Sequence, residues 1–341
     1  MTPKNLFITG ATGFIGGSVL EKIVHTHPEL EITALLRSPS DVFKTTYPKV
    51  KIQLGDFDAF EVIEKASYET DIVIHTGDID HPGCVAAILS GLKKKMTPSF
   101  LIHLTGTGCI SDELTQSWEG ETNPYIWDDI RDIEKIYNLP DEALHHTVDR
   151  EIMDASNQLL KTAIICPPDI YGQHRGTGTR ATFMVPEYIK VLQKHKEAFY
   201  LGHGQNYRAV THIDDVVQMF VTLLDQAVQG GGRAQWGKEG FYFTVADEVR
   251  WIDAAEAINE IAIRQGWLPA GNKPVSWTKE QLGSLMPSFP RLVLYLWGSN
   301  SRAVSERAKK LGWKPQAPSF WEALEEDVKI AGDSKVPSAL M

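Results

Sequence analysis

A glycine-rich turn near the start of this 341-residue chain constrains its fold more than any other feature. An apolar run at residues 6–8 stops at Gly10, glycines follow at 13 and 16, and an apolar pattern with helical spacing begins at Val19. This order predicts a strand, a tight turn and the start of a helix, an arrangement in which backbone N–H groups and the helix N-terminus meet a pyrophosphate. The spacing is G-x-x-G-x-x-G, not the usual G-x-G-x-x-G. Its position between a strand and a helix nevertheless favours a dinucleotide site over a turn used only for packing.

Strand and helix patterns alternate through the first half of the chain. Six apolar segments predict strands, at residues 6–8, 31–36, 50–54, 71–75, 100–104 and 162–166. Helical patterns lie between them, the last at residues 141–159. Strands separated by helices imply right-handed crossovers and parallel pairing. The predicted fold is therefore α/β, a Rossmann-type doubly wound parallel sheet with a smaller C-terminal substrate-binding lobe.

The pattern changes after the Pro-Pro pair at residues 167–168. We expect a dinucleotide-binding domain over residues 1–168, to which residues 203–245 return. Residues 169–202 and 246–332 form the expected substrate-binding lobe, and residues 333–341 a tail. Within residues 203–245, Asp214 and Asp215 are expected to cap a helix.

Composition excludes several classes of function. The formal charge of −10 argues against nucleic acid as the main partner, because phosphate binding needs clustered Lys and Arg. Three widely spaced cysteines, Cys84, Cys109 and Cys166, favour a reducing compartment over a disulfide framework, and no cluster has metal-ligand spacing. We expect no signal peptide and no membrane span, hence a cytoplasmic protein, and leave a homodimer open.

Four motifs resemble the extended and atypical short-chain dehydrogenase/reductase superfamily, and in particular its NAD-dependent epimerase/dehydratase and NmrA-like members. They are the glycine turn at residues 9–17, Asp56 after the third strand, the Pro-Pro-Asp-Ile-Tyr-Gly segment at 167–172, and the Arg-containing segment at 208–215. The resemblance implies that Asp56 lies near an adenine ring and that Arg208 binds a substrate phosphate. The cofactor-binding residues that it implies are Gly10, Thr12, Gly13, Phe14, Ile15, Gly16 and Pro167, and Tyr171 is an implied substrate residue. His75 and Thr76 are expected along the cofactor's second ribose, the alternative being plain strand-end packing.

The end of the second predicted strand indicates which cofactor binds. An NAD site usually has an acid there, which accepts a hydrogen bond from the ribose 2′-hydroxyl. This chain has Arg37 and Ser38 instead. A guanidinium fits a 2′-phosphate bidentately, whereas an acid would repel it. We therefore expect NADP(H), the alternative being an ordinary exposed arginine.

The catalytic pair that the resemblance implies, Tyr-x-x-x-Lys on the helix after strand five, is missing. Its one literal match, at residues 47–51, contains a proline and lies between the second and third strands. The helix expected at 141–159 contains no Tyr, but His146 and Arg150 stand four residues apart on it. They are our candidate acid/base and its partner, the alternative being that His145 and His146 only pack or face solvent.

A hydroxyl that orients a carbonyl is expected from Thr105 or Thr107, unless these residues only form a Gly-Thr turn. Trp118, Tyr125 and Trp127 are expected to cover the substrate, which favours a flat, apolar molecule. Arg175 and Arg180 lie in a loop expected to rim the pocket. The resulting hypothesis is an NADPH-dependent oxidoreductase that reduces a carbonyl or enone of a small metabolite, aromatic compounds included. The alternatives are a non-redox isomerase, cyclase or lyase, and an NmrA-like regulator that binds NADP(H) without catalysis.

Overall fold

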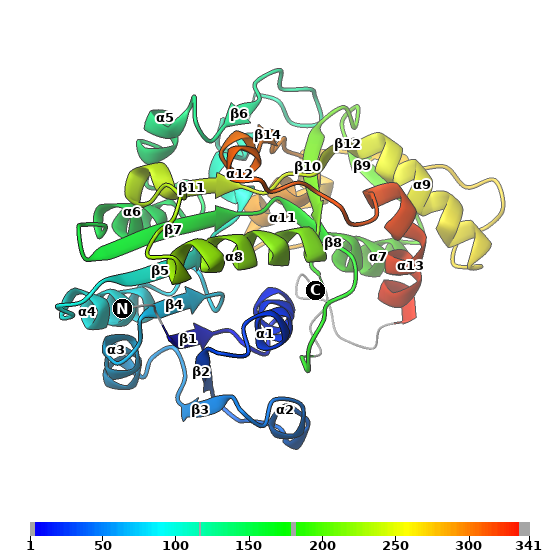
Figure 1. Ribbon diagram of the computed structural model, residues 1–341. Helices are drawn as coiled ribbons and strands as arrows, with labels where there is room; N and C mark the ends of the chain where they lie inside the picture. Colours follow the sequence, from blue (N-terminus) through cyan, green and yellow to red (C-terminus); the bar gives the residue numbers. More distant parts are fainter. Residues whose placement is uncertain (1–3, 116, 179–181, 334–341) are drawn as a thin grey trace.

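The computed structural model describes residues 4–115, 117–178 and 182–333, and its centre is a seven-stranded, fully parallel sheet (Figure 1). The strand order is β11-β7-β5-β4-β1-β2-β3. The strands are β1 (Asn5–Thr9), β2 (Glu31–Leu36), β3 (Lys51–Leu54), β4 (Ile72–His75), β5 (Ser99–Leu104), β7 (Leu160–Cys166) and β11 (Phe241–Phe243). Most of them are continuous apolar runs, because helices cover both faces of the sheet. The predicted α/β doubly wound fold is confirmed.

Alternate residues of each strand serve the two faces. In β1, Leu6 and Ile8 pack on the face that carries α1 (Phe14–Thr26) and α8 (Ile213–Val228), whereas Phe7 packs on the opposite face. The opposite face carries α3 (Phe60–Tyr68), α4 (Pro82–Lys93) and α6 (His146–Asp154), and a short α2 (Asp41–Thr46) joins β2 to β3. The sheet is thus buried on both sides, and its polar groups are left to the strand ends.

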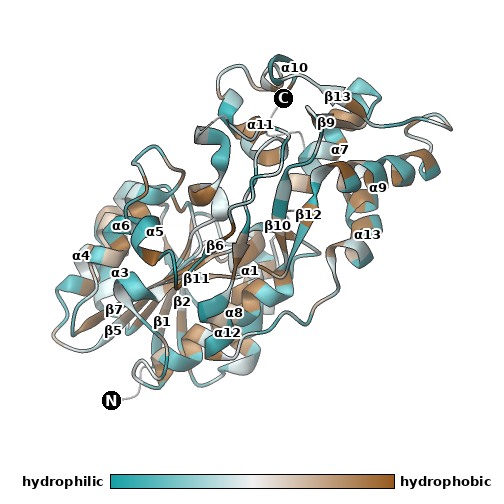
Figure 2. Cartoon of the chain, turned by 90° about the horizontal axis from the view of Figure 1, so that it is seen from above, coloured by the Kyte–Doolittle hydropathy of each residue, from teal (hydrophilic) through white to brown (hydrophobic). Residues whose placement is uncertain are grey.

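A second lobe lies beyond the carboxyl ends of the strands and has its own apolar core (Figure 2). Aromatic residues dominate this core, and the rings of Tyr188 and Phe199 stack with centroids 4.5 Å apart. Its strands are β8 (Asp169–Tyr171), β10 (Tyr207–His212) and β12 (Asp247–Arg250) in one sheet, with β9 (Phe199–Leu201) paired to β13 (Val275–Trp277). Its helices are α7 (Met184–His195), α9 (Trp251–Arg264), α10 (Lys279–Gly283), α11 (Pro290–Trp297) and α13 (Phe320–Asp333).

A third set of short elements links the two parts. It comprises β6 (Trp127–Asp128), β14 (Ala303–Val304), α5 (Ile133–Tyr137), α12 (Glu306–Leu311) and 3₁₀ turns at Thr107–Ile110, Asp112–Leu114 and Gly237–Gly240. Ala303, Ala308 and Leu311 pack with the residues of the central sheet, although the sequence analysis places them in the lobe. Strand β10 also differs from expectation, because it pairs with β8 and β12 of the lobe.

The helix predicted at residues 141–159 is much shorter. Residues 141–145 form turns after Pro140, and His145 has a left-handed backbone with φ 67°. The helix ends at Asp154, and the side chain of Asn157 then accepts bonds from the backbone N–H groups of residues 159 and 160. The predicted cap of α8 is also wrong: the His212 side chain accepts from the Asp214 N–H, and the two aspartates lie inside the first turn.

In the described part of the chain, every helix is too short or too polar to cross a membrane.

Candidate functional site: the carboxyl ends of the central strands

The glycine turn joins β1 to α1, and Gly13 differs from Gly10 and Gly16 in what surrounds it. A Cβ at Gly10, which has φ +74°, would lie 2.3 Å from the Thr76 carbonyl oxygen. A Cβ at Gly16 would lie 2.3 Å from the Gly10 oxygen and from Thr76 Oγ1. A Cβ at Gly13 would meet only the Gly10 oxygen, at 3.1 Å. Close approach of β1, α1 and β4 thus explains Gly10 and Gly16, whereas at Gly13 the protein leaves space.

That space opens into a cavity of about 500 Å³ at the ends of β1, β2, β3 and β4. The 13-residue helix α1 begins there, and no described side chain caps its N-terminus. Uncapped N–H groups at the start of a helix are suited to an anion. The residues that line the cavity are Gly10, Thr12, Gly13, Leu35, Leu36, Arg37, Gly55, Asp56, Phe57, Thr76, Gly77 and Asp78.

Arg37 lies between this cavity and a second one of about 350 Å³, which is lined by Thr12, Leu36, Arg37 and Ser38. The Arg37 side chain is exposed, and none of the described residues forms an ion pair or hydrogen bond with it. On the other side of the first cavity, the exposed Asp56 accepts a bond from the Asp58 N–H. An adenosine with a 2′-phosphate fits this arrangement, with an acid for the base and a free guanidinium for the phosphate.

The structure places the other expected cofactor residues differently. Thr76 lines the cavity, but its hydroxyl also donates to the Thr9 carbonyl. Phe14, Ile15 and Gly16 lie in the first turn of α1 and are not among the lining residues. Pro167 lies farther along the sheet, where its carbonyl accepts from the Thr107 N–H at 3.0 Å. The sequence analysis missed Phe57 and Asp78, although Phe57 directly follows Asp56 and Asp78 lies three residues after a predicted strand end.

His75 is buried inside the sheet end and does not lie along the cavity. The parallel register aligns Thr9 with His75 and His75 with His103. His75 Nδ1 is 2.5 Å from Thr9 Oγ1, and its ring stacks on that of His103 with centroids 5.1 Å apart. Burial lowers the pKa of His75 to about 4 and that of His103 well below its usual value. Both rings are therefore neutral at pH 7.

Next to this row, the end of β5 meets the start of α6. Thr105 Oγ1 donates to Asp149 Oδ2 at 2.8 Å, and both side chains are buried. Burial raises the pKa of the Asp149 carboxyl to about 7, although His145 and the Thr105 bond oppose that shift. His145 Nδ1 lies 2.7 and 2.9 Å from the two carboxylate oxygens of Asp80. Thr107, the other candidate hydroxyl, is fully buried in the adjacent 3₁₀ turn.

The structure does not bring His146 and Arg150 to this group. The His146 side chain is buried, its Nε2 is without a hydrogen-bond partner among the described residues, and burial lowers its pKa. The Arg150 guanidinium pairs with Asp141 at 2.6 Å near the surface. The reason is the register of α6: the residues that face β5 are His145 and Asp149, one position earlier. Their i, i+4 spacing in the sequence is the signal that could have identified them.

Arg208 also does not lie where a substrate-binding residue was expected. It is fully buried, and its guanidinium bonds to Asp169 at 2.7 Å, to the Tyr295 carbonyl at 2.6 Å and to Ser299 at 3.0 Å. These contacts hold β8, β10 and α11 together. Tyr171 is also buried, and its hydroxyl donates to the Pro318 carbonyl. Neither side chain is placed to reach a substrate phosphate from solvent.

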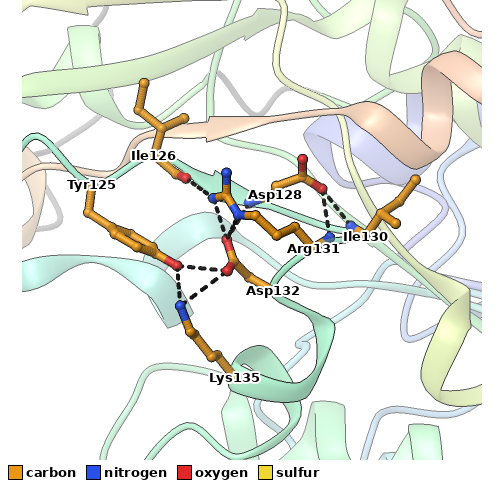
Figure 3. Close-up of polar contacts among 7 residues, drawn as sticks. All are labelled: Tyr125, Ile126, Asp128, Ile130, Arg131, Asp132 and Lys135. Atoms are coloured by element: carbon orange, nitrogen blue, oxygen red, sulfur yellow. Dashed lines mark hydrogen bonds and ion pairs between the residues drawn. The ribbon is translucent and has the colours of Figure 1, made fainter.

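The aromatic residues expected to cover the substrate have different surroundings: some face solvent, and others contact neighbouring side chains. Trp118 is exposed, whereas Trp127 is half-buried and its ring lies edge-on to that of Tyr125. The Tyr125 hydroxyl donates to the buried Asp132, which also pairs with Arg131 and Lys135 (Figure 3). This cluster fixes the segment before α5.

Arg175, from the loop expected to rim the pocket, pairs with Asp214 at 3.1 Å, and Arg180 lies outside the described residues. A separate, polar hollow of about 810 Å³ borders Arg175 between α1, α8 and residues 312–317, and it shares no lining residue with the cavity beside Gly13. Among the described residues there is no group of three or more His, Cys, Asp or Glu side chains that could hold a metal ion.

Comparisons with known proteins agree with the fold and with the expectation of a nicotinamide cofactor. The sequence model of the NAD dependent epimerase/dehydratase family matches residues 143–236, and that of the Male sterility protein family matches residues 8–86. Oxidase ucsJ from Acremonium sp is 29% identical over 338 residues, which cover 94% of this chain and 96% of that protein.

Two solved structures share the fold at 14% sequence identity. The UDP-glucose 4-epimerase of Thermotoga maritima with UDP-glucose superposes with a TM-score of 0.63 over 95% of this chain and 97% of its own. The dTDP-glucose 4,6-dehydratase of Bacillus anthracis in complex with NAD superposes with a TM-score of 0.62 over 97% of both chains.

These findings confirm the resemblance to the extended short-chain dehydrogenase/reductase superfamily, NAD-dependent epimerase/dehydratase members included, that the sequence motifs indicated. The family matched is one of nicotinamide-dependent enzymes, and the proteins matched include an oxidase, an epimerase and a dehydratase. The likeness to NmrA-like members stays a prediction.

Proposed function

We propose that this protein is an NADP(H)-dependent oxidoreductase that reduces a carbonyl or enone of a small metabolite, aromatic compounds included. The observation that carries the proposal is Arg37, an exposed guanidinium free of described partners at the end of β2, where it borders both cavities. An isolated cation beside a nucleotide-sized cavity suits the 2′-phosphate that distinguishes NADP(H). The similarity to an oxidase supports redox chemistry.

Each part of the cofactor has a matching group in the cavity. The space at Gly13 and the uncapped start of α1 would receive the pyrophosphate, and Asp56 would face the adenine. Arg37 and Ser38 would hold the 2′-phosphate. Thr76 and Asp78 line the cavity after β4, the strand next to β5, and the bound nicotinamide would supply hydride on that side.

The test is a paired titration followed by a turnover assay. NADPH and NADH binding would be measured by calorimetry, and NADPH oxidation would then be followed with a panel of ketones, aldehydes and enones. We expect tighter binding of NADPH and turnover with at least one carbonyl class. Equal affinity for the two cofactors would remove the NADP(H) assignment, and tight binding without turnover would favour the regulator.

A non-redox isomerase, cyclase or lyase is the second candidate. The pairing of His145 with Asp80 favours it, because a carboxylate-held imidazole performs proton transfer whether or not hydride moves. Product formed without net consumption of NADPH would identify this class.

A cytoplasmic location is part of the same proposal. Cys84, Cys109 and Cys166 are all buried free thiols, which suits a reducing compartment.

A further inference from the structure

We propose that His145 is the proton donor and acceptor of the site, with Asp80 and Asp149 as its positioning residues. This inference rests on the proposed function, because it assigns the acid/base residue of the same site. It replaces the pairing of His146 with Arg150 by a pair one position earlier on the chain.

The two nitrogens of His145 have different surroundings. Nδ1 is held by the Asp80 carboxylate at 2.7 and 2.9 Å. Nε2 faces the turn after β5: it lies 3.6 Å from the position a Cβ would take at Gly106, and 3.3 Å from that position at Gly108. The side chain keeps 18% of its exposure, and no described residue bonds to Nε2. One nitrogen is thus fixed by a carboxylate, and the other is free to exchange a proton.

The backbone holds His145 in an uncommon conformation. Its φ of 67° places a non-glycine residue in the left-handed region, at the point where the chain enters α6. Such conformations persist only where surrounding contacts enforce them, and they concentrate at functional sites. The absence of side chains at Gly106 and Gly108 leaves room for the ring beside the β5 turn.

Asp149 fixes the other end of this helical turn. Its N–H donates to the His145 carbonyl at 3.0 Å, and its carboxyl accepts from Thr105 at 2.8 Å. His145 and Asp149 are therefore tied to the same helix turn and to the same strand end. They have the i, i+4 spacing of a Tyr-x-x-x-Lys pair and meet the strand that such a pair would face.

The cofactor cavity borders the chain segment that carries Asp80. Gly77 and Asp78 line the cavity, and Asp80 follows two residues later in the same segment. Because β4 and β5 are neighbours in the sheet, the segment after β4 and the turn after β5 lie side by side. A substrate carbonyl placed over the β5 turn would have His145 at its oxygen.

In a carbonyl reduction, the substrate receives one hydride at carbon and one proton at oxygen, and His145 supplies the proton. As the carbonyl carbon receives hydride, the protonated His145 gives its Nε2 proton to the carbonyl oxygen, and an alcohol forms. The neutral imidazole then recovers a proton from water. The Asp80 carboxylate stabilises the imidazolium, and the hydrogen bond at Nδ1 keeps Nε2 aimed at the oxygen.

The first test measures His145 itself and needs no substrate. Imidazole ¹⁵N NMR on the full chain would follow the His145 ring, assigned with His145→Gln. We expect Nδ1 to carry a hydrogen-bonded proton, the pKa to lie above the usual 6.5, and NADP⁺ to shift the ring signals. The charged or titratable groups around the ring are Asp78, Asp80, Asp149 and His103. Asp80→Asn should lower the pKa.

His203 is the matched control. It is exposed and pairs with Glu121 through Nδ1, on the lobe side of the molecule. Glu121→Gln should change the His203 ring signals and leave the pKa of His145 unchanged, and NADP⁺ should not shift the His203 signals. A His145 ring that does not respond to NADP⁺ would overturn the proposal.

The second test is kinetic and uses the carbonyl probe that the wild type reduces. His145→Gln should lower kcat about 10²–10⁴-fold with NADPH affinity nearly unchanged, whereas His203→Gln and His146→Gln should have little effect. Asp80→Asn should lower kcat less and shift the pH profile to lower pH. Full kcat in His145→Gln would refute the assignment while leaving the proposed function intact. Failure of the wild type on every probe would refute the proposed function, and the NMR response would then decide the role of His145.

Discussion

Two regions of the row formed by the strands' carboxyl termini, one at its β2–β3 edge and one near its middle, hold their polar groups in opposite ways. At the ends of β2 and β3, Arg37 and Asp56 are exposed, and none of the described residues pairs with the guanidinium. At the ends of β4 and β5, the polar side chains are buried against one another. They are His75, His103, Thr105 and Asp149. We call these the open end and the closed end.

The difference separates two ways of building a site. The open end consists of backbone groups and one guanidinium without a described partner. A charged ligand would supply the missing partner. The closed end is assembled before any ligand arrives, and its groups have shifted pKa values because they have left water. Mutations at the open end should therefore affect binding alone, whereas mutations at the closed end should also affect folding stability.

The largest effect that we predict at the open end is that of Gly13→Val. A side chain there would occupy the space next to the uncapped start of α1, and we expect NADPH binding to fall below detection. The protein should stay folded, because a Cβ at this position meets only one backbone oxygen, at 3.1 Å. Calorimetry and circular dichroism would measure the two effects.

Gly16→Val is the matched control for that experiment. Its Cβ would lie 2.3 Å from Gly10 and from Thr76, so this variant should lose stability, by about 1–3 kcal/mol or more. Retained NADPH affinity in a folded Gly13→Val protein would place the nucleotide elsewhere and remove the comparison.

The lobe has a buried polar pair of its own, Asp169 and Arg208, and here the predicted effect is on stability. Asp169→Asn would leave the fully buried Arg208 guanidinium without its carboxylate partner. Breaking one side of a buried ion pair typically costs about 3–5 kcal/mol. Urea denaturation should show a loss of that size, with NADPH affinity unchanged in the protein that remains folded. A stable variant with weakened phosphate-ligand binding would restore the role that the sequence motif gave to Arg208.

Asp149 should make stability depend on pH. Its pKa in the fold is about 7, against 3.8 in the unfolded chain, so the fold favours the neutral carboxyl. The stabilisation is complete below pH 4 and is lost as pH rises through 7. Asp149→Asn lacks this dependence. Its stability relative to the wild type should therefore improve between pH 4 and pH 8, by an amount on the order of 3 kcal/mol.

Because Asp129, His75 and His103 also have shifted pKa values, the difference between variant and wild type is the informative quantity, not either curve alone. A constant difference across this range would mean that Asp149 is ionised in the fold.

The sequence predicted the open end well, for a physical reason. The glycine turn and the six strands follow from local rules: glycine where backbones approach, and apolar runs where both faces are covered. The cavity beside Gly13 and Arg37 forms directly where those strands end.

The closed end depends on facts that no local pattern contains. Whether His145 or His146 faces β5 depends on where α6 begins, and that start follows a left-handed residue after Pro140. The sequence motif around Arg208 predicted where this residue stands in the order of elements, but it did not predict that the side chain is buried. The burial results from packing against Asp169 and Tyr295, which come from distant parts of the chain. The contacts that a side chain makes depend on tertiary structure, so the position of a motif in the sequence predicted those contacts poorly.

The smallest predicted effect is the sharpest test of the open end. Arg37→Ala should weaken NADPH binding by about 1–3 kcal/mol, the usual contribution of a charge-assisted phosphate contact, and should leave NADH binding unchanged. Its melting temperature should equal that of the wild type, because the guanidinium is exposed and has no partner among the described residues.

Arg175→Ala is the matched control: this arginine is also largely exposed, but it pairs with Asp214 and does not line the cofactor cavity. It should change the affinity for neither cofactor. If Arg37→Ala weakened NADPH and NADH binding equally, the guanidinium would act on the adenosine or pyrophosphate that both cofactors share, and the preference for NADP(H) would have no basis at the end of β2.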